Sequence, residues 1–398
     1  MKQEIFFKKI TKNSINSKES LCRALGISLD DLDYCFHLPK ESRYSQPRNI
    51  SPKRDGSIRN IYNPNTKIRE VQKKIKNKIL KSNLIIKWPH YVYGVEKKEK
   101  NSPPKDFVAS AAVHCQSKTI LKIDIKDFFD NISEELVVNV FENLYKYPPH
   151  ISSLLADLCC YDGFLPQGAL TSSHLATLIL FDTEPEIVKK LSYKKLKYTR
   201  YIDDITISSE IHNYDMSYAQ KIIEQMLTEK GLFINKNKTF SGTHSLCSLD
   251  VHGLLVDSKK PRITAEKKKN IRAAIHQLKL DYSIPNRNSN PGYKKEHERI
   301  SGRVSLLTRL KHPKAKKYRE ALKSIPHKPN HYDVKVTISQ IKILSENTNK
   351  NNLLWYKSFY HKVEYRVNWF RGHKDPFRLS SHEKLSESIR LYKPKNNK

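Results

Sequence analysis

The chain has 398 residues, 38% of them hydrophobic, which is enough for a substantial core and at this length predicts two or three subdomains. Lys and Arg total 73 against 41 Asp and Glu, and the formal charge of +32 predicts a polyanionic partner, most obviously nucleic acid. No stretch approaches the roughly 18 apolar residues of a membrane-spanning helix, which excludes a membrane-spanning protein.

The first residues, MKQEIFFKKITKN, lack the long apolar run and the small-residue cleavage site of a secretory signal, so we expect a cytoplasmic protein. The six cysteines form no CxxC pair, and in a chain of this length they predict buried thiols rather than a disulfide framework. Cys159 and Cys160 fit two small apolar side chains at a helix end better than a redox pair.

Residues 1–50 carry short helical patterns at 20–25 and 28–35 and predict a small helical lead-in. Residues 51–80 then predict a β-hairpin that turns at Asp55–Gly56, followed by an amphipathic helix. The apolar face of that helix consists of Ile68, Val71, Ile75 and Ile79. Its other face is nearly all Lys and Arg, which is either solvated or a surface for the polyanion.

Residues 119–125 predict a short apolar strand with Asp124 near its end, followed by an aromatic turn and a helix with an acidic start at Glu134. A Pro-Gly loop comes next. Thr171 or Ser172 is expected to cap the helix that follows, which runs toward Phe181.

Two β-patterned runs flank the pair Asp203–Asp204, which predicts a hairpin with both carboxylates at its tip. A helix over 216–230 follows and ends at Gly231 in the manner of a C-terminal cap. The next residues, 231–239, are predicted to continue as a strand.

From about residue 261 the chain is rich in Lys, helical in pattern and poor in strands, with a loop predicted at 285–292. The last 70 or so residues interleave many aromatic side chains with Lys, Arg and His. This pattern suits base stacking beside phosphate contacts, and it equally suits a small core with a basic rim.

The aspartates predict a metal-dependent site. Asp124 at a strand end and two aspartates at a hairpin tip converge if the strands are neighbours about 5 Å apart. Phosphoryl transfer to a hydroxyl needs two divalent ions, which prefer hard oxygen ligands. Asp124 and Asp203 are the expected bridging ligands. Asp204 is expected to point to the opposite face and to support them.

A family resemblance rests on these segments. LKIDIKDFF, LPQGALTSS, YIDD, GLFINKNKT and VHG resemble, in this order, the core motifs of reverse transcriptases. DGSIRNIYNP and REVQKKI resemble the family's first fingers motif, and residues 300–318 resemble its thumb. The resemblance implies an RNA-directed DNA polymerase of α+β class with the right-hand polymerase fold, which takes dNTPs, copies an RNA template into DNA and uses two Mg²⁺ ions, with Mn²⁺ as an alternative.

The same resemblance implies a division of the chain into five parts. These are an N-terminal helical lead-in (1–50), fingers (51–118), a palm with an antiparallel sheet (119–257, with fingers helices at about 134–164), a helical thumb (258–328) and a basic aromatic C-terminal extension (329–398).

Further roles follow from positions within the matched motifs. Phe129, five residues after Asp124, resembles the aromatic gate that collides with a ribose 2′ hydroxyl, with a plain core Phe as the alternative. Gln167 and Gly168 are expected under the incoming nucleotide and template base, where a missing side chain allows close approach. Ile125 is expected to contribute to nucleotide and metal binding.

Three more residues are assigned in the same way. Lys238, seven residues after Gly231, resembles the lysine that protonates pyrophosphate, with a solvated Lys as an equal alternative. Arg59 is expected to reach the triphosphate from the fingers hairpin. His114 is expected to be structural or to face RNA.

The lineage is indicated by SAAVH at 110–114, which resembles the NAxxH element of bacterial retron enzymes, and by VHG, which stands where retrons usually carry VTG. Ser110 and His252 depart from those patterns, and YIDD replaces the commoner YADD. These departures favour the bacterial reverse transcriptases that defend against phage, acting on a dedicated noncoding RNA. A true retron enzyme is second and a group II intron enzyme third, since no HNH-like Cys and His spacing is present. An accessory defence protein and oligomerisation are both open.

Two readings from other classes compete. A catalytically silent nucleic-acid-binding effector would not need the intact set of Asp124, Asp203 and Asp204. An RNA-dependent RNA polymerase has a similar palm but generally lacks an aromatic residue at the position of Phe129.

Overall fold

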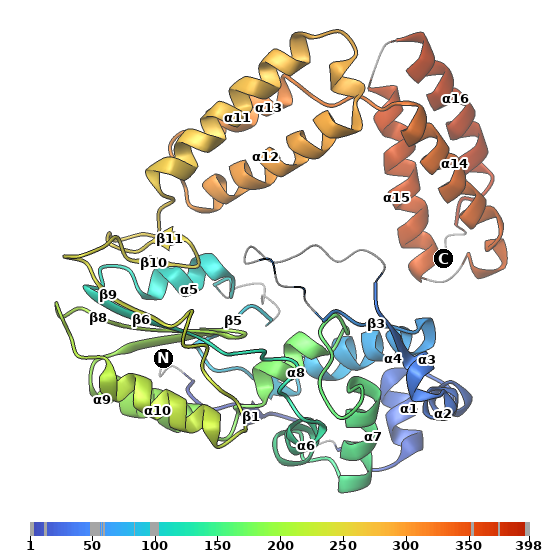
Figure 1. Ribbon diagram of the computed structural model, residues 1–398. Coiled ribbons are helices and arrows are strands. Elements are labelled where there is room, and N and C mark those ends of the chain that lie inside the picture. Colours follow the sequence, from blue (N-terminus) through green and yellow to red (C-terminus); the bar gives the residue numbers. More distant parts are fainter. Residues whose placement is uncertain are drawn as a thin grey trace. The chain divides into compact units, whose positions relative to one another are not determined.

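The computed structural model describes residues 4–11, 14–47, 56, 58, 60–82, 84–95, 103–351, 354–372 and 375–394. The chain divides into two compact units, Met1–Ile263 and Thr264–Lys398 (Figure 1). The first unit contains the β-sheet and the second is helical. Within the described residues, no helix combines the length and apolar character needed to cross a membrane.

The first unit is built around a five-stranded sheet. Its strands, in spatial order, are β5 (Val92–Tyr93), β7 (Lys197–Tyr201), β8 (Asp204–Ser209), β6 (Thr119–Asp124) and β9 (Phe240–Thr243). β5 runs parallel to β7, and the other neighbours are antiparallel.

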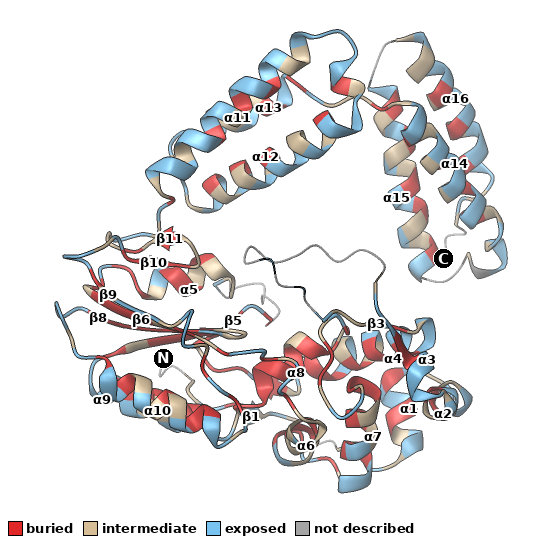
Figure 2. Ribbon diagram, viewed as in Figure 1, coloured by how far each residue is buried: buried red, intermediate tan, exposed pale blue. Residues whose placement is uncertain are grey.

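Helices cover both faces of this sheet, with α5 (Phe107–Val113) on one side and α9 (Glu184–Tyr193) and α10 (Ser217–Thr228) on the other (Figure 1). Strands covered on both faces are apolar along their length rather than alternating. This explains why β6 and β8 are buried at most positions (Figure 2).

The predicted N-terminal helices are confirmed as α1 (Lys18–Leu25) and α2 (Leu29–His37). Ser17 and Ser28 cap them by accepting hydrogen bonds from backbone N–H groups three residues later. The predicted amphipathic helix is also confirmed as α4 (Thr66–Ile75), which continues into a π-helical turn, η1 (Lys76–Leu80). Its four predicted apolar residues are all buried in the core.

The remaining elements of the first unit are β1 (Lys8–Lys9), α3 (Lys40–Arg43), β2 (Tyr44–Ser45), β3 (Asn63–Pro64), β4 (Ile86–Lys87), α6 (Glu134–Asn139), the π-helical η2 (Val140–Leu144), α7 (Pro149–Cys159), α8 (Ser172–Leu178), β10 (Asp250–Val251) and β11 (Leu254–Leu255). Helices and sheet share one hydrophobic core. The predicted hairpin turn at Asp55–Gly56 lies largely outside the described residues.

The predicted strand over 231–239 is wrong. Leu232 and Ile234 are buried and Phe233 is exposed, which is the alternation of a strand. The segment, however, meets the sheet only at the end of β6, where Ile234 forms a single bridge with Ile125. The chain then turns, and the next strand begins at Phe240.

The helix predicted to run toward Phe181 is α8, which ends at Leu178. Thr171 occupies the N-cap position, but its side chain makes no capping hydrogen bond, so the predicted cap is present by position only. Ser172 is the first helical residue, and its hydroxyl donates to the carbonyl of Pro166 at 2.7 Å, which ties the helix start to the preceding loop.

The second unit consists of helices. They are α11 (Ala265–Ser283), the short 3-10 turn η3 (Arg287–Ser289), α12 (Pro291–Arg309), α13 (Ala315–Lys323), α14 (His331–Ser345), the 3-10 turn η4 (Thr348–Lys350), α15 (Leu354–Arg371) and α16 (Pro376–Arg390). The predicted loop at 285–292 is confirmed except for the η3 turn and the start of α12.

The aromatic residues near the C-terminus divide into a buried and an exposed set. Tyr356, Tyr360 and Phe370 are buried in the core shared by α14, α15 and α16. Trp355 and Tyr365 are 41% and 81% exposed on α15. The second unit therefore has a small aromatic core and also displays aromatic rings to solvent.

Candidate active site

The pairing of strands brings the aspartates together. In β6 and β8, Asp124 lies opposite Asp204. In the hairpin of β7 and β8, Tyr201 lies opposite Asp204, so the two turn residues are Ile202 and Asp203. The prediction placed both Asp203 and Asp204 at the tip of the hairpin. Only Asp203 lies there, because Asp204 pairs with Asp124 in the neighbouring strand.

The turn is strained at Ile202, whose φ of 58° is unusual for a β-branched residue. Its carbonyl accepts a hydrogen bond from Arg200 Nη1 at 3.1 Å. On the other side, a Cβ on Gly94 would lie 3.2 Å from the ring of Tyr201 and 3.3 Å from Ile202. Contacts on both sides therefore fix the conformation of the turn.

Arg200 is anchored by a buried ion pair. Its guanidinium donates two hydrogen bonds to Glu184, at 2.5 and 2.7 Å, and one to the carbonyl of Thr177 at 2.7 Å. Both charged side chains are fully buried. Removing one partner of such a pair leaves an uncompensated buried charge, so Arg200 and Glu184 fix the base of the turn.

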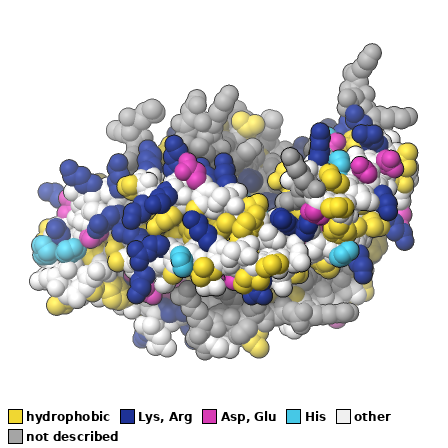
Figure 3. Space-filling view, turned by 90° about the horizontal axis from the view of Figure 1, so that it is seen from above, with side chains coloured by type: hydrophobic (Ala, Val, Ile, Leu, Met, Phe, Trp, Pro, Cys, Tyr) yellow, Lys and Arg dark blue, Asp and Glu magenta, His cyan; other side chains and the backbone are white. Residues whose placement is uncertain are grey.

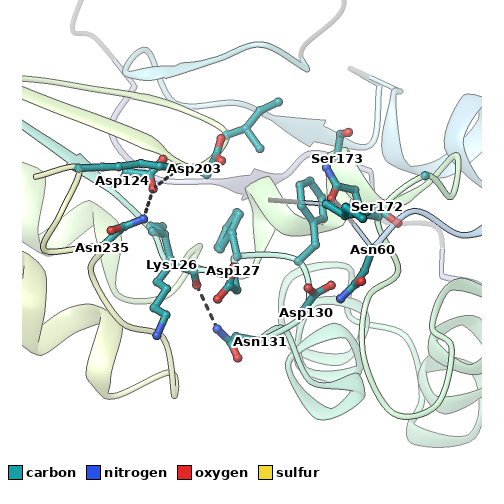
Figure 4. A pocket seen from close by; sticks show the side chains of 18 of the residues that line it. Asn60, Asp124, Lys126, Asp127, Asp130, Asn131, Ser172, Ser173, Asp203 and Asn235 are labelled. Carbon is teal, nitrogen blue, oxygen red and sulfur yellow. Dashed lines mark hydrogen bonds and ion pairs between the residues drawn. The ribbon is translucent and has the colours of Figure 1, made fainter. Parts of the chain in front are cut away.

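A cavity of about 1120 Å³ opens beside the turn. Figure 4 shows Asp124, Asp203 and Asn235 on one side of it and Asn60, Ser172 and Ser173 on the other. The predicted site residues that line it are Asp124, Ile125, Phe129, Gln167, Gly168, Asp203 and Lys238. Residues from four separate motifs therefore meet at one cavity.

Asp124 is largely buried, and one of its oxygens has two polar neighbours. Oδ2 accepts a hydrogen bond from Asn235 Nδ2 at 3.1 Å and lies 3.4 Å from Lys238 Nζ. The backbone N–H of Asn235 also donates to the carbonyl of Asp124 at 2.7 Å. Sequence reasoning missed Asn235, although it lies within the matched motif GLFINKNKT.

Asp204 faces a second, smaller cavity of about 270 Å³, which Asp124 and Lys238 also line. Although 51% of its side chain is exposed, loss of hydration and the like charges of Asp203 and Asp124 raise the pKa of Asp204 to about 6. The expectation that Asp204 points away from Asp203 agrees with this placement.

The donor chemistry suits a divalent cation, since carboxylates are the hard oxygen ligands that such ions prefer. Among the described residues, however, no three His, Cys, Asp or Glu side chains are close enough together to hold a metal ion. Lys238 neutralises part of the charge at Asp124, and like charges keep the carboxylates apart. The carboxylates are of the right chemical kind for a divalent cation. Binding of the cation would have to draw their side chains closer together.

Gly168 is required by its contact with a neighbouring segment of the chain. Its φ is 111°, and a Cβ there would lie 2.6 Å from the carbonyl oxygen of Tyr62. The carbonyl of the preceding Gln167 accepts a hydrogen bond from Tyr62 N–H at 2.8 Å. The close approach at Gly168 is thus to the segment before β3, which forms one wall of the cavity.

The other predicted residues have varied positions. Phe129 packs partly against the core while lining the cavity. Arg59 lies outside the described residues, and its neighbours Ile58 and Asn60 line the cavity. His114 is fully buried, and burial lowers its pKa to about 3, so it is a neutral structural residue.

The fold and site define the class of a template-directed polymerase: strands that carry aspartates meet at a large polar cavity within a mixed arrangement of helices and sheet. The family model described as "Reverse transcriptase (RNA-dependent DNA polymerase)" matches residues 51–285. The chain therefore belongs to the reverse transcriptase family and is an RNA-directed DNA polymerase, with the right-hand polymerase type of fold. Members of this family use divalent metal ions.

Curated relatives carry retron names. The chain is 39% identical to "Retron Ec48 reverse transcriptase" of Escherichia coli, over 91% of this chain and 90% of that protein. It is 30% identical to "Retron Se72 reverse transcriptase" of Salmonella heidelberg, over 83% and 84%. The retron resemblance read from the motifs is confirmed.

Among solved structures, telomerase from Candida albicans in complex with a fragment of telomeric RNA matches 71% of this chain and 51% of that chain. The TM-score is 0.33 and the sequence identity 14%, so this likeness is too distant to inform the site.

Proposed function

We propose that DNA synthesis takes place in the larger cavity, with Asp124 and Asp203 as the main ligands of two Mg²⁺ ions, Mn²⁺ being able to replace them. Asp204 and the backbone at Ile125 support these ligands. The observation that carries the proposal is the strand register, which places Asp124 opposite Asp204 and beside the turn that contains Asp203. In this proposal the sheet and α8 belong to the palm, α4 to α7 contribute to the fingers and α11 to α13 form the thumb.

Bound divalent ions would lower the pKa of the attacking hydroxyl and steady the leaving pyrophosphate. The chain's own residues prepare the site for this chemistry. Asn235 and Lys238 hold Asp124 in place, and Lys238, whose side chain is half exposed, is able to give a proton to the leaving group. Phe129, Gln167 and Gly168 all line the cavity, which supports a role for Phe129 in excluding a ribose 2′ hydroxyl and roles for Gln167 and Gly168 beneath the nucleotide.

The test of this site is primer extension by a protein in which Asp203 and Asp204 are both replaced by Ala. Incorporation of dNTPs should be lost, because the carboxylates that hold the ions are gone. The matched control replaces Asp215, an exposed residue before α10, by Ala. Primer extension by the doubly substituted protein at the normal rate would refute the site assignment.

We also propose that the template is a dedicated noncoding RNA of the retron type, read in bacterial defence against phage. Support comes from the retron names of the relatives and from the exposed aromatic and basic residues of α15. Sequencing the nucleic acid that co-purifies with the protein tests this. A discrete branched RNA–DNA supports a retron product, whereas a long or repetitive DNA would favour the other defence-associated lineages.

A further inference from the structure

Two residues that depart from the usual retron pattern contact each other. Ser110 stands in α5 where retrons carry Asn, and His252 stands near β10 where they carry Thr. The hydroxyl oxygen of Ser110 lies 3.3 Å from His252 Nε2, although the residues are 142 positions apart in the sequence. The two departures are therefore one structural feature, which lies next to the catalytic turn.

The backbone presents His252 at the end of a hairpin. Val251 pairs with Leu254, so His252 and Gly253 are the two turn residues, with φ values of 50° and 72°. Two positive φ values are the requirement of a type I′ turn, which matches the twist of a β-hairpin. Asp250 accepts a hydrogen bond from the N–H of Gly253 at 3.1 Å and stabilises this turn.

The imidazole touches both residues that close the catalytic turn. Its ring centroid lies 5.0 Å from that of Tyr201, and its Nδ1 lies 3.7 Å from Asp204 Oδ2. The side chain of His252 is only 12% exposed, so the ring is held between the two hairpins.

A row of buried polar groups continues from Ser110 into the sheet. The Ser110 hydroxyl lies 3.1 Å from that of Thr199, Thr199 lies 2.8 Å from His114 Nε2, and His114 Nδ1 lies 2.7 Å from the hydroxyl of Ser208. All four residues are buried. Each hydroxyl in the row donates one proton, and each neutral imidazole has one donor and one acceptor nitrogen. The direction of one hydrogen bond therefore fixes the direction of the next.

The row can run in either of two directions: when Ser110 donates to Thr199, it accepts from His252 Nε2–H. With the proton of His252 on Nδ1, Nε2 accepts from Ser110, Ser110 accepts from Thr199, and Thr199 accepts from His114 Nε2–H. His114 Nδ1 then accepts from Ser208. The opposite arrangement would turn the bare lone pair of His252 Nδ1 toward a carboxylate. The carboxylate of Asp204, 3.7 Å from Nδ1, therefore favours the tautomer that points an N–H group at it.

We propose that His252 is a positioning residue of the polymerase site, with Ser110 holding its ring so that Nδ1–H faces Asp204. This inference rests on the proposed role of Asp204 as a metal-binding carboxylate. Asp204 is half exposed and is repelled by Asp124 and Asp203, so a fixed donor beside it limits the orientations of its carboxylate. Partners that orient ligands in this way typically change metal affinity or activity about 10- to 100-fold when they are removed.

The experiment measures primer extension against Mg²⁺ concentration for His252→Gly and His252→Asn. Glycine removes the ring while accepting the positive φ of the turn, so the hairpin is preserved. The half-saturating Mg²⁺ concentration should rise about 10-fold in His252→Gly. Asparagine also tolerates positive φ and keeps an N–H donor, so His252→Asn should recover most of the loss. The control, His212→Gly, changes an exposed histidine just beyond β8.

Ser110→Ala tests the coupling. Because Ser110 acts through His252, the double variant Ser110→Ala with His252→Gly should require no more Mg²⁺ than His252→Gly alone. Losses that multiply would refute the coupling, and an unchanged Mg²⁺ requirement in a folded His252→Gly protein would refute the positioning role. An unchanged Mg²⁺ requirement in Asp204→Ala would instead refute the metal-binding role of Asp204 on which this inference depends.

Discussion

At the scale of single residues, the three aspartates differ in what surrounds them. Asp124 is largely buried and has Asn235 and Lys238 as polar neighbours. Asp204 is half exposed and has a raised pKa. A cationic neighbour already stabilises the ionised form of Asp124. Asp204 is surrounded by like charges, so a bound cation would stabilise its ionised form more. In the proposed metal site, a bound divalent ion would relieve this repulsion.

A prediction at this scale concerns Phe129. Replacing Phe129 by Ala should admit ribonucleotides, because the ring that would meet the 2′ hydroxyl is removed from the cavity wall. Discrimination between dNTPs and NTPs should fall about 10- to 100-fold, the range typical for steric selection by a pocket. Steady-state incorporation of each nucleotide type measures the ratio, with exposed Phe6→Ala as the control. Unchanged selectivity would make Phe129 an ordinary core residue.

The sequence predicted side-chain positions correctly where a motif places a residue at the end of a strand. Asp124 and Asp203 line one cavity because their strands are neighbours. It could not find the contact of Ser110 with His252, or that of Arg200 with Glu184, because such contacts depend on how α5, α9 and the hairpins pack. The reason for Gly168 also required the structure, since Tyr62 lies far away in the sequence.

At the scale of elements, periodicity predicted α1, α2 and α4 well, because each has one apolar face and a capping residue. The strand over 231–239 failed although its alternation was correct. A strand needs a partner along its length, and residue periodicity does not show whether the neighbouring edge is available. Beside Ile234 the sheet offers only the end of β6.

A prediction for the loop before α8 follows from Gly168. Gly168→Ala should lower stability by about 3 kcal/mol, because the left-handed φ and a contact of 2.6 Å with the Tyr62 carbonyl both oppose a Cβ. Gly163→Ala is the matched control, since its φ is also positive but its Cβ would meet nothing within 4 Å. It should cost only about 1 kcal/mol. Melting temperatures that fall equally would show that backbone conformation alone is responsible.

A second prediction at this scale concerns the junction of α12, α14 and α15. Asp333 near the start of α14 is buried, and it contacts Lys294 at 3.0 Å and Arg366 at 3.2 Å. Burial by itself would raise its pKa, but the N–H of Asn330 and these two cations hold the pKa of Asp333 below its ordinary value. The carboxylate therefore stabilises the folded state only when it is ionised.

The pH dependence has a definite sign. The pKa of Asp333 is lower in the folded state than in the unfolded state. Its carboxylate therefore stabilises the fold fully above the unfolded pKa of about 4, and this stabilisation is lost as the pH falls through the folded-state pKa. Asp333→Asn should lower the melting temperature at neutral pH by several degrees, and the difference should shrink below about pH 4. The control, Glu296→Gln, breaks an exposed pair with Arg299 and should change little. A difference that is constant with pH would contradict this account.

At the scale of the whole molecule, the formal charge of +32 is the dominant physical fact. Figure 3 shows Lys and Arg side chains spread over one face, with hydrophobic side chains among them. Such a surface gains affinity for nucleic acid largely by releasing counterions, and this contribution weakens with salt. Exposed rings contribute through stacking, which salt affects little.

Substitutions on α15 distinguish the contribution of counterion release from that of ring stacking. Affinity for the RNA that co-purifies should fall about a thousandfold between roughly 50 and 200 mM salt if six or more phosphates are contacted. Exposed Lys362→Ala should reduce the slope of log affinity against log salt by about one. Tyr365→Ala should weaken binding by about 1–3 kcal/mol and leave the slope unchanged, because stacking on a base releases few counterions. Tyr193→Ala, an equally exposed tyrosine on α9, is the control. If Tyr365→Ala changed the slope as Lys362→Ala does, the ring would be acting by orienting neighbouring cations rather than by stacking.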